Sequence, residues 1–336
     1  MTAACTTPEP EIVAGFQPQA AEALLDDTIH AVAYSGFRSG QHPDRGEGAV
    51  FPSREEILED LNLLQQAGLT LIRLYDSQQN SRDVLEVIRE QGLPHKVMLG
   101  VWLNAEKSNH ETCAWLTEPI PKEKLEANRL GNQVELQRGI ALANEFDEIV
   151  VAMNVGNETL VDWNDHGVPV ESQKAYMDQA RPAIDQPVTT AENYEAWIAH
   201  ASTIAESVDF AGVHTYPAWE NKTVVQAIDY SIDNLRRVQE AMPEVPIAIV
   251  EAGWASQASE FGPRASEAKQ VRHHDELMAW ARANNVTTFW FEAFDEDWKG
   301  NPDNPLGAEK HWGLWRVDRT PKAVVSADRL PLAPGR

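Results

Sequence analysis

Short apolar segments alternate with amphipathic segments along most of the chain, and this alternation predicts its secondary structure. Residues 149–153 (IVVAM) are too few for a buried helix and too apolar for a half-exposed strand. They predict a strand that is covered on both faces, as in a parallel sheet. The same reasoning predicts strands at residues 29–34, 70–75, 96–103, 149–155, 187–192, 208–215, 246–250 and 287–294.

Helices are predicted between these strands. A capping box at residues 53–56 (SREE) marks the start of the first helix, and Gly68 is placed to end it. Between them, apolar residues recur at helical spacing. Further helices are expected at residues 81–91, 125–146, 169–184, 195–206, 224–238 and 266–285, with only a short final helix at 324–330.

Eight strands that alternate with seven or eight helices in 336 residues predict a single-domain (β/α)8 TIM barrel of the α/β class. No internal repeat and no linker divides the sequence. A doubly wound open sheet is the alternative, but neither G-x-G-x-x-G nor a P-loop motif follows an early strand. Residues 1–16, rich in Thr, Pro and Glu, are expected to form a flexible lead-in, and residues 17–336 are expected to form the barrel.

Composition and charge narrow the possible ligands. The net charge of −24 disfavours nucleic acid and anionic polysaccharides, which this chain would repel, and leaves neutral or cationic substrates open. The apolar runs fall short of the roughly 18 residues that a membrane helix needs, so we expect no membrane span. The two cysteines, Cys5 and Cys113, give neither a disulfide framework nor the spacing of metal ligands.

The first residues leave the cellular location open. No basic, apolar and cleavage-site regions follow Met1, so no signal peptide is visible. Residues 2–5 (TAAC) weakly resemble a lipoprotein cleavage site without its leader. A secreted, periplasmic or lipid-anchored protein that had been trimmed would begin in the same way.

Polar, ionisable and aromatic residues collect where the predicted strands end, while the strand bodies are apolar. In a barrel these ends share one face, which carries the active site. Glu158 and Glu251 each follow an apolar run directly. Two carboxylates in these positions are the minimum that acid–base or nucleophilic catalysis on an acetal requires. The alternative is that each glutamate merely caps the next helix. Asn, His, Tyr, Lys and Trp side chains at the same ends suit a sugar ligand.

The sequence gives little support to a metal site or to a nucleophile other than a carboxylate. His273 and His274 are adjacent, so on a helix they point about 100° apart and cannot share a metal ion. Residues 295–300 begin like a calcium loop, but Lys299 and Leu306 occupy positions that require ligands. No G-x-S-x-G motif is present. We therefore expect no metal and no cofactor. His214 fits a satisfied buried histidine as well as a site residue.

Several stretches carry a family resemblance: residues 72–76 (IRLYD), 155–158 (VGNE), 213–217 (VHTYP), 251–256 (EAGWAS), 294–299 (FDEDWK) and 312–315 (WGLW). In this order they resemble the motifs of glycoside hydrolase family 17. That family comprises retaining β-1,3-glucanases and related β-1,3-glucanosyltransferases of (β/α)8 fold, and this chain resembles a bacterial-type member with a single catalytic domain. The departures from the motifs are Ala252, Ala255 and Asp295, which affect loop shape and supporting bonds and leave both glutamates in place.

The resemblance implies roles for individual residues. Glu158 would be the general acid/base, Glu251 the nucleophile, and Asn157 a donor to the sugar 2-hydroxyl. A retaining pair lies about 5–5.5 Å apart, which drives the two pKa values apart. Glu296, Lys299 and Glu309 would form a supporting charged cluster. The expected substrate-binding residues are Tyr34, Arg38, Arg73, Tyr75, Asp76, Asn157, His214, Tyr216, Trp254, Glu296, Lys299 and Glu309.

These observations together predict a monomeric hydrolase that cleaves neutral β-1,3-glucan by double displacement. A β-1,3-glucanosyltransferase that uses the same two glutamates is the first alternative; a carbohydrate-binding barrel without turnover and a retaining glycosidase of another linkage are the others. The long segments 36–52 and 104–122 follow strands one and three. We expect them to wall the groove and favour short products from chain ends, unless they lie flat on the barrel and leave an open cleft.

Overall fold

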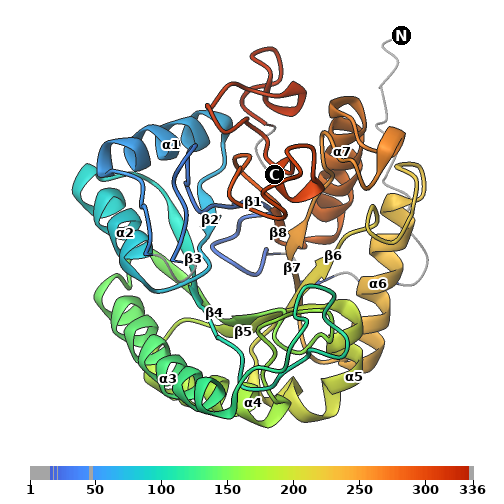
Figure 1. The fold of residues 1–336 in the computed structure, drawn as a ribbon. Coiled ribbons are helices and arrows are strands. Elements are labelled where there is room, and N and C mark those ends of the chain that lie inside the picture. Colours follow the sequence, from blue (N-terminus) through green and yellow to red (C-terminus); the bar gives the residue numbers. More distant parts are fainter. Residues whose placement is uncertain (1–15, 18, 21, 45–47, 333–336) are drawn as a thin grey trace.

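The computed structural model describes residues 16–332 except 18, 21 and 45–47, and its centre is a ring of parallel strands that closes on itself (Figure 1). Every strand pairs with the next in chain order, and β8 pairs with β1. The predicted single (β/α)8 barrel is therefore confirmed. The strands are β1 His30–Ala33, β2 Leu71–Arg73, β3 Lys96–Val101, β4 Val150–Asn157, β5 Val188–Asn193, β6 Ala211–Thr215, β7 Ile247–Ala252 and β8 Thr288–Trp290.

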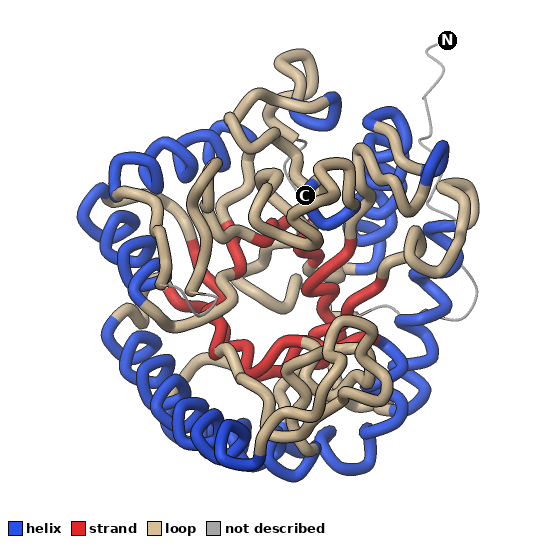
Figure 2. Tube along the Cα trace, in the orientation of Figure 1, coloured by secondary structure: helices blue, strands red, loops and turns tan. Residues whose placement is uncertain are grey.

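Helices surround this ring, and loops gather over one end of it (Figure 2). After β8, the described part of the chain forms short 3-10 turns but no further α-helix. Within the described residues, none of the helices is both long enough and apolar enough to cross a membrane. The helices are α1 Arg54–Ala67, α2 Gln79–Gln91, α3 Lys122–Glu145, α4 Val170–Ala180, α5 Tyr194–Ile204, α6 Ala227–Ala241 and α7 Glu267–Asn284.

The helix ends follow from local sequence chemistry. Ser53 accepts a hydrogen bond from the Glu56 amide at 3.2 Å, while Glu56 accepts one from the Ser53 amide at 2.8 Å, which confirms the capping box. Gly68 and Gly92 end α1 and α2 with φ of 81° and 61°, a left-handed conformation that glycine adopts at little cost.

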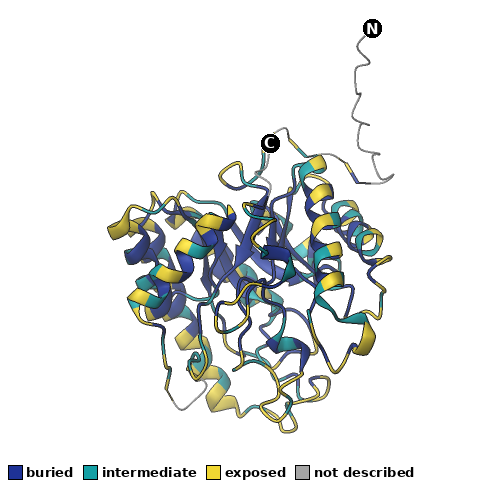
Figure 3. Cartoon of the chain, turned by 90° about the horizontal axis from the view of Figure 1, so that it is seen from above, coloured by how far each residue is buried: buried dark blue, intermediate teal, exposed yellow. Residues whose placement is uncertain are grey.

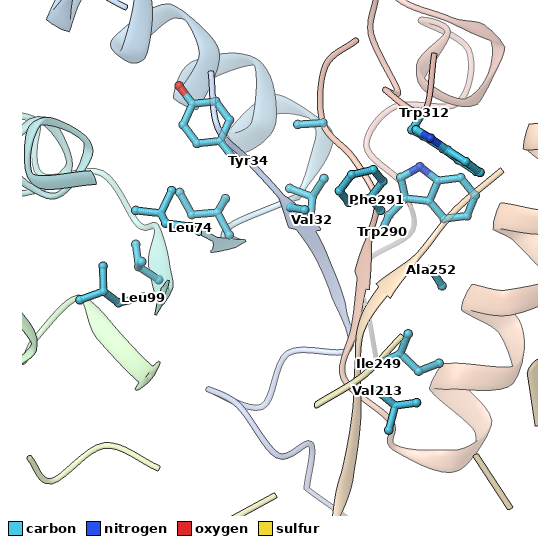
Figure 4. Packing of buried hydrophobic residues seen from close by; sticks show 14 of the residues in the cluster. Val32, Tyr34, Leu74, Leu99, Val213, Ile249, Ala252, Trp290, Phe291 and Trp312 are labelled. Atoms are coloured by element: carbon cyan, nitrogen blue, oxygen red, sulfur yellow. The ribbon is translucent and has the colours of Figure 1, made fainter. Parts of the chain in front are cut away.

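The core forms two layers, with the strands buried on both faces (Figure 3). Apolar strand residues pack with helix residues in the outer layer, part of which Figure 4 shows around Trp290, Val32 and Ile249. Small side chains help to fill the inside of the barrel, as expected for a packed core without a channel. The inner cluster is Leu25, Ala31, Leu71, Met98, Ala152, Ala191, Phe210, Ala248, Val250 and Phe289.

Some predicted boundaries were wrong. The fourth helix stops at Ala180 and continues as a 3-10 turn, because Pro182 has no amide hydrogen to extend an α-helix. The sixth helix begins at Ala227, so Val224 is buried in the preceding turn. Phe16 was assigned to the flexible lead-in, yet it is buried against Trp280 with ring centroids 5.2 Å apart. The rest of that lead-in, residues 1–15, lies outside the described residues.

The segment after β8 takes the place of an eighth helix beside α1 and α7 (Figure 1). The Arg319 guanidinium donates to both carboxylate oxygens of buried Asp60, at 2.8 and 2.6 Å. The Leu332 amide donates to the carbonyl of Ala67 at the end of α1. A bidentate, buried ion pair fixes geometry strictly, so this segment is anchored despite its lack of regular structure.

Three buried histidines lie between the barrel and α7. His30 and His274 approach each other with Nε2 atoms 3.2 Å apart, and neither ring nitrogen of His273 has a hydrogen-bond partner among the described residues. Burial lowers the pKa of His30 and His274 below the usual value and lowers that of His273 to about 3. A neutral imidazole is therefore favoured in the folded protein.

We expect this cluster to weaken the fold in mild acid. A histidine whose folded-state pKa is depressed contributes stability that is fully present above its unfolded pKa of about 6.5 and is lost as the pH falls. Between roughly pH 7 and pH 5, His273 should cost about 2 kcal/mol of unfolding free energy. His273→Leu should flatten that loss when chemical unfolding is measured across this range. If the unfolding free energies of the wild type and of His273→Leu changed equally with pH, His273 would not be the source of the loss.

Candidate active site

The two glutamates meet at the carboxyl ends of β4 and β7, and one histidine nitrogen lies between them. His214, at the end of β6, has its Nδ1 2.9 Å from Oε1 of Glu158 and 3.5 Å from Oε2 of Glu251. Because both carboxylates contact one atom, they lie close together. This arrangement favours the separation of about 5–5.5 Å found in retaining glycosidases over the about 6.5–9.5 Å of inverting ones.

Glu251 is buried, and both of its carboxylate oxygens accept hydrogen bonds from neighbouring side chains. Its Oε1 accepts from Arg73 at 2.8 Å and from the Tyr75 hydroxyl at 2.9 Å, and its Oε2 accepts from the Tyr216 hydroxyl at 2.6 Å. Burial by itself would raise the pKa of Glu251, but His214, Arg73 and the two hydroxyls outweigh it and hold that pKa below the usual value. Glu251 is thus kept ionised, as a nucleophile requires.

His214 contacts this network through both ring nitrogens. Its Nε2 lies 3.3 Å from an Arg73 nitrogen, whose two hydrogens are donated to the carbonyl of Val250 at 2.9 Å and to Glu251 at 2.8 Å. Arg73 also donates to Oδ1 of Asn157 at 2.6 Å. Arg73 and His214 thus connect the ends of β4, β6 and β7 through one network of polar contacts.

Glu158 occupies an unusual backbone position. Its φ is 50°, a left-handed value that costs a non-glycine residue energy and is common at functional sites. The chain turns sharply here: the Glu158 amide donates to the carbonyl of Ala191, and Gly156 has φ of 82°. A Cβ on Gly156 would meet Gln173 Oε1 at 2.8 Å, so this position requires glycine.

A second group of ionisable residues lies at the end of β8. The Lys299 ammonium bridges Glu292 at 2.5 Å and Glu296 at 2.7 Å, and Ser35 donates to Glu296 at 2.7 Å. Burial would lower the pKa of Lys299, but the two carboxylates raise it above its usual range. Burial, reinforced by the charges of Glu158 and Glu251 and opposed by Lys299, raises the pKa of Glu309 to about 7. The charges of both catalytic carboxylates therefore reach Glu309.

Four of the expected substrate-binding residues serve other contacts. Tyr34 and Trp254 are fully buried; the Tyr34 hydroxyl donates to Asp60 and the Trp254 indole donates to the carbonyl of Arg264. Both polar groups are thus engaged within the protein, and the assignment of Tyr34 and Trp254 as substrate contacts stays a prediction. Arg38 pairs with acidic residues of α1, and Asp76 accepts from Gln78 and Ser81 at the start of α2. Both stabilise the helix beside them.

The other expected residues do converge on the pair of glutamates. Arg73, Tyr75, Asn157, His214 and Tyr216 bond to one another or to a glutamate, while Glu296, Lys299 and Glu309 form the charged group beside them.

Two further residues belong to the site although they were not among the expected substrate-binding residues. Trp312 packs against Tyr216, with ring centroids 5.3 Å apart, and supports the hydroxyl that bonds to Glu251. Glu292 shares Lys299 with Glu296, and burial raises its pKa well above the usual value. Both carried a signal, since Trp312 lies in the WGLW stretch and Glu292 follows an apolar strand. No group of three or more His, Cys, Asp or Glu in the described residues is arranged to hold a metal ion.

The two long segments after β1 and β3 contact different loops at the end of the barrel that carries the site. The segment after β1 contacts the segment after β8, through Ser39 with Asp297 at 2.9 Å and through the rings of Phe37 and Trp298. The segment after β3 instead packs on the β4–α4 loop, where Asn109 donates to two of its carbonyls. The two loops therefore do not build one common wall.

A closed (β/α)8 barrel with two carboxylates meeting at the ends of β4 and β7 defines the class of barrel glycoside hydrolases. Residues 31–313 match the model of the BtgE/BtgC glycoside hydrolase domain, and the chain belongs to that family. The match spans every strand of the barrel except the first residue of β1.

Named relatives agree with this assignment. A glucan 1,3-beta-glucosidase of Arthroderma benhamiae is 26% identical over 319 residues, which cover 89% of this chain and 92% of that protein. The glucan 1,3-beta-glucosidase of Saccharomyces cerevisiae is 28% identical over 244 residues, covering 69% of this chain and 72% of that protein.

Solved structures show the same architecture. An endo-laminarinase from Formosa Hel1_33_131 superposes with a TM-score of 0.76 and 26% identity, covering 89% of this chain and 86% of that one. The glycoside hydrolase family 17 β-1,3-glucanosyltransferase of Rhizomucor miehei has a TM-score of 0.69 at 20% identity, covering 89% of this chain and 97% of that one, and supports the fold alone.

Proposed function

We propose that this protein is a retaining β-1,3-glucan hydrolase of the family 17 type, with residues 17–336 as its catalytic domain. The observation that carries the proposal is the pair of carboxylates around His214, with Glu251 held ionised by Arg73 and two tyrosine hydroxyls. The names of the relatives and of the Formosa enzyme support β-1,3-glucan as the substrate class.

In the first step, a carboxylate oxygen of Glu251 attacks the anomeric carbon while Glu158 donates its proton to the leaving glycosidic oxygen. The bond between that oxygen and the anomeric carbon breaks, and a glycosyl ester of Glu251 forms. In the second step, Glu158 removes a proton from water, which attacks the same carbon and frees Glu251. Two inversions restore the β-configuration.

The neighbouring residues assist this sequence in different ways. Arg73, Tyr75 and Tyr216 hold the nucleophile in one orientation and stabilise its charge. Asn157 accepts from Arg73 through its carbonyl oxygen, which leaves its amide hydrogens to bind the sugar 2-hydroxyl. Lys299 and its carboxylate partners, with Glu309, would bind sugar hydroxyls beside the catalytic pair.

A β-1,3-glucanosyltransferase is the second candidate, because the same two glutamates would serve if a sugar hydroxyl replaced water in the second step. The Rhizomucor miehei enzyme, which has the same fold, is such a transferase. It predicts products longer than the substrate, which a hydrolase does not form in dilute solution.

The product pattern tests the proposal. The segment after β1 is held against the segment after β8, so it should close one side of the substrate groove. A groove closed on one side should favour short products from chain ends. Laminarin digests should release one short product steadily, and NMR should show its β-anomer first. If the α-anomer appeared first, double displacement would be ruled out. If long oligosaccharides accumulated early, the groove would be open. Products longer than the substrate would favour the transferase.

A further inference from the structure

The turn that carries Glu158 is held by a histidine of its own loop. In the β4–α4 loop, Nε2 of His166 lies 2.9 Å from the carbonyl oxygen of Asn157. The same Nε2 lies 2.9 Å from Nδ2 of Asn164, so this one ring nitrogen contacts both the carbonyl oxygen and the side-chain amide. The carbonyl belongs to the peptide bond that leads directly into Glu158.

The neighbours of His166 fix its ring from the other sides. Its face packs on the Trp102 indole, with ring centroids 4.6 Å apart and planes inclined by 37°. Its Nδ1 lies 3.2 Å from the Asp165 carboxylate. Asn164, which is buried, contacts Nε2 and donates to the carbonyl of Glu158 at 2.9 Å. Both carbonyls that flank the Glu158 backbone are therefore occupied by this loop.

The loop itself is anchored from outside. Besides the two bonds from Asn109, the amides of Glu106 and Lys107 donate to the carbonyl of Gly167. A Cβ on Gly167 would lie 2.6 Å from Asn109 Nδ2, so the two loops are in close contact. Such support matters because a left-handed glutamate persists only where its surroundings over-determine it.

We propose that His166, with Asn164, is a positioning residue that holds Glu158 in place to protonate the leaving group. The inference rests on the proposed function, since it assumes that Glu158 is the general acid. Loss of the His166 hydrogen bond should let the turn relax, and a displacement of about 1 Å can cost on the order of 10²-fold in rate. The effect should fall on proton donation and spare the nucleophile on β7.

The test compares kcat/KM on a laminari-oligosaccharide with kcat/KM on a dinitrophenyl β-laminaribioside, whose leaving group needs no proton. His166→Leu should lose about 10–100-fold on the first substrate and little on the second. Asn164→Ala should follow the same pattern. His166→Gln keeps an amide that can donate to the Asn157 carbonyl or accept from the Asn164 amide, and it should recover most of the loss. His110→Leu, in the β3–α3 loop, is the matched control and should behave as wild type.

A double variant makes the result decisive. In a Glu158→Ala background, His166→Leu should cause no further loss on either substrate, because the group it positions is gone. Equal losses on both substrates, or additive losses in the double variant, would overturn the positioning role. If Glu158→Ala itself showed no dependence on the leaving group, the proposed function would fail, whatever His166 does.

Discussion

Glu251→Gln should abolish turnover on laminarin while leaving the barrel folded. The amide cannot attack the anomeric carbon, so no covalent intermediate forms. Loss of a covalent nucleophile in other enzymes costs about 10⁶-fold in kcat, and we expect more than about 10⁴-fold here. Initial rates of reducing-sugar release would measure the effect.

The variant also disturbs a buried charge network, so folding must be checked separately. Arg73 is buried and loses its charged partner, and the new amide nitrogen must face a donor from Arg73 or a tyrosine. Thermal unfolding and binding of laminari-oligosaccharides should therefore be measured alongside. Glu244→Gln, at an exposed glutamate just before β7, is the control that should keep full activity. A folded Glu251→Gln protein with substantial turnover would refute the assignment.

Glu158→Ala should produce a loss that depends on the leaving group. General acid–base help is worth about 10²–10⁴-fold, so kcat/KM on laminari-oligosaccharides should fall by that factor. On an activated aryl glucoside the fall should be much smaller, since that leaving group departs without a proton. Added azide should speed turnover of the activated substrate, because azide attacks the glycosyl ester without a general base.

The comparison across leaving groups separates this role from others. Steady-state rates on a series of aryl glucosides should depend more steeply on leaving-group acidity in Glu158→Ala than in the wild type. Equal losses on poor and good leaving groups would mean that Glu158 binds substrate or supports the fold. An inverted azide product would exclude attack on a glycosyl ester of Glu251.

Much of the architecture followed from local sequence patterns. Apolar runs of strand length separated by amphipathic helices predicted the barrel, because those periodicities reflect which faces are buried. The capping box at Ser53 and the glycine at Gly68 marked helix ends through bonds within a few residues. Boundaries were less certain: Val224, for example, continues the helical pattern but lies before α6.

The convergence of Glu158 and Glu251 was also predictable, although they lie 93 positions apart in the sequence. Both follow strands, and the carboxyl ends of all barrel strands meet on one face. A fold predicted from pattern thus places the pair without any contact being known. The contact of both carboxylates with His214 was not predictable, since the sequence suited a satisfied core histidine equally well.

The sequence by itself therefore determined the fold class, the face that carries the site and the two glutamates on it. Only the tertiary structure decided which side chains turn into that site. Tyr34 follows β1 as Tyr75 follows β2, yet one hydroxyl meets Asp60 and the other meets Glu251. Strand position fixes where a residue sits, but burial and partners depend on packing between distant segments, as when Arg319 reaches Asp60. Such contacts leave no periodic trace in the chain, so sequence patterns cannot reveal them.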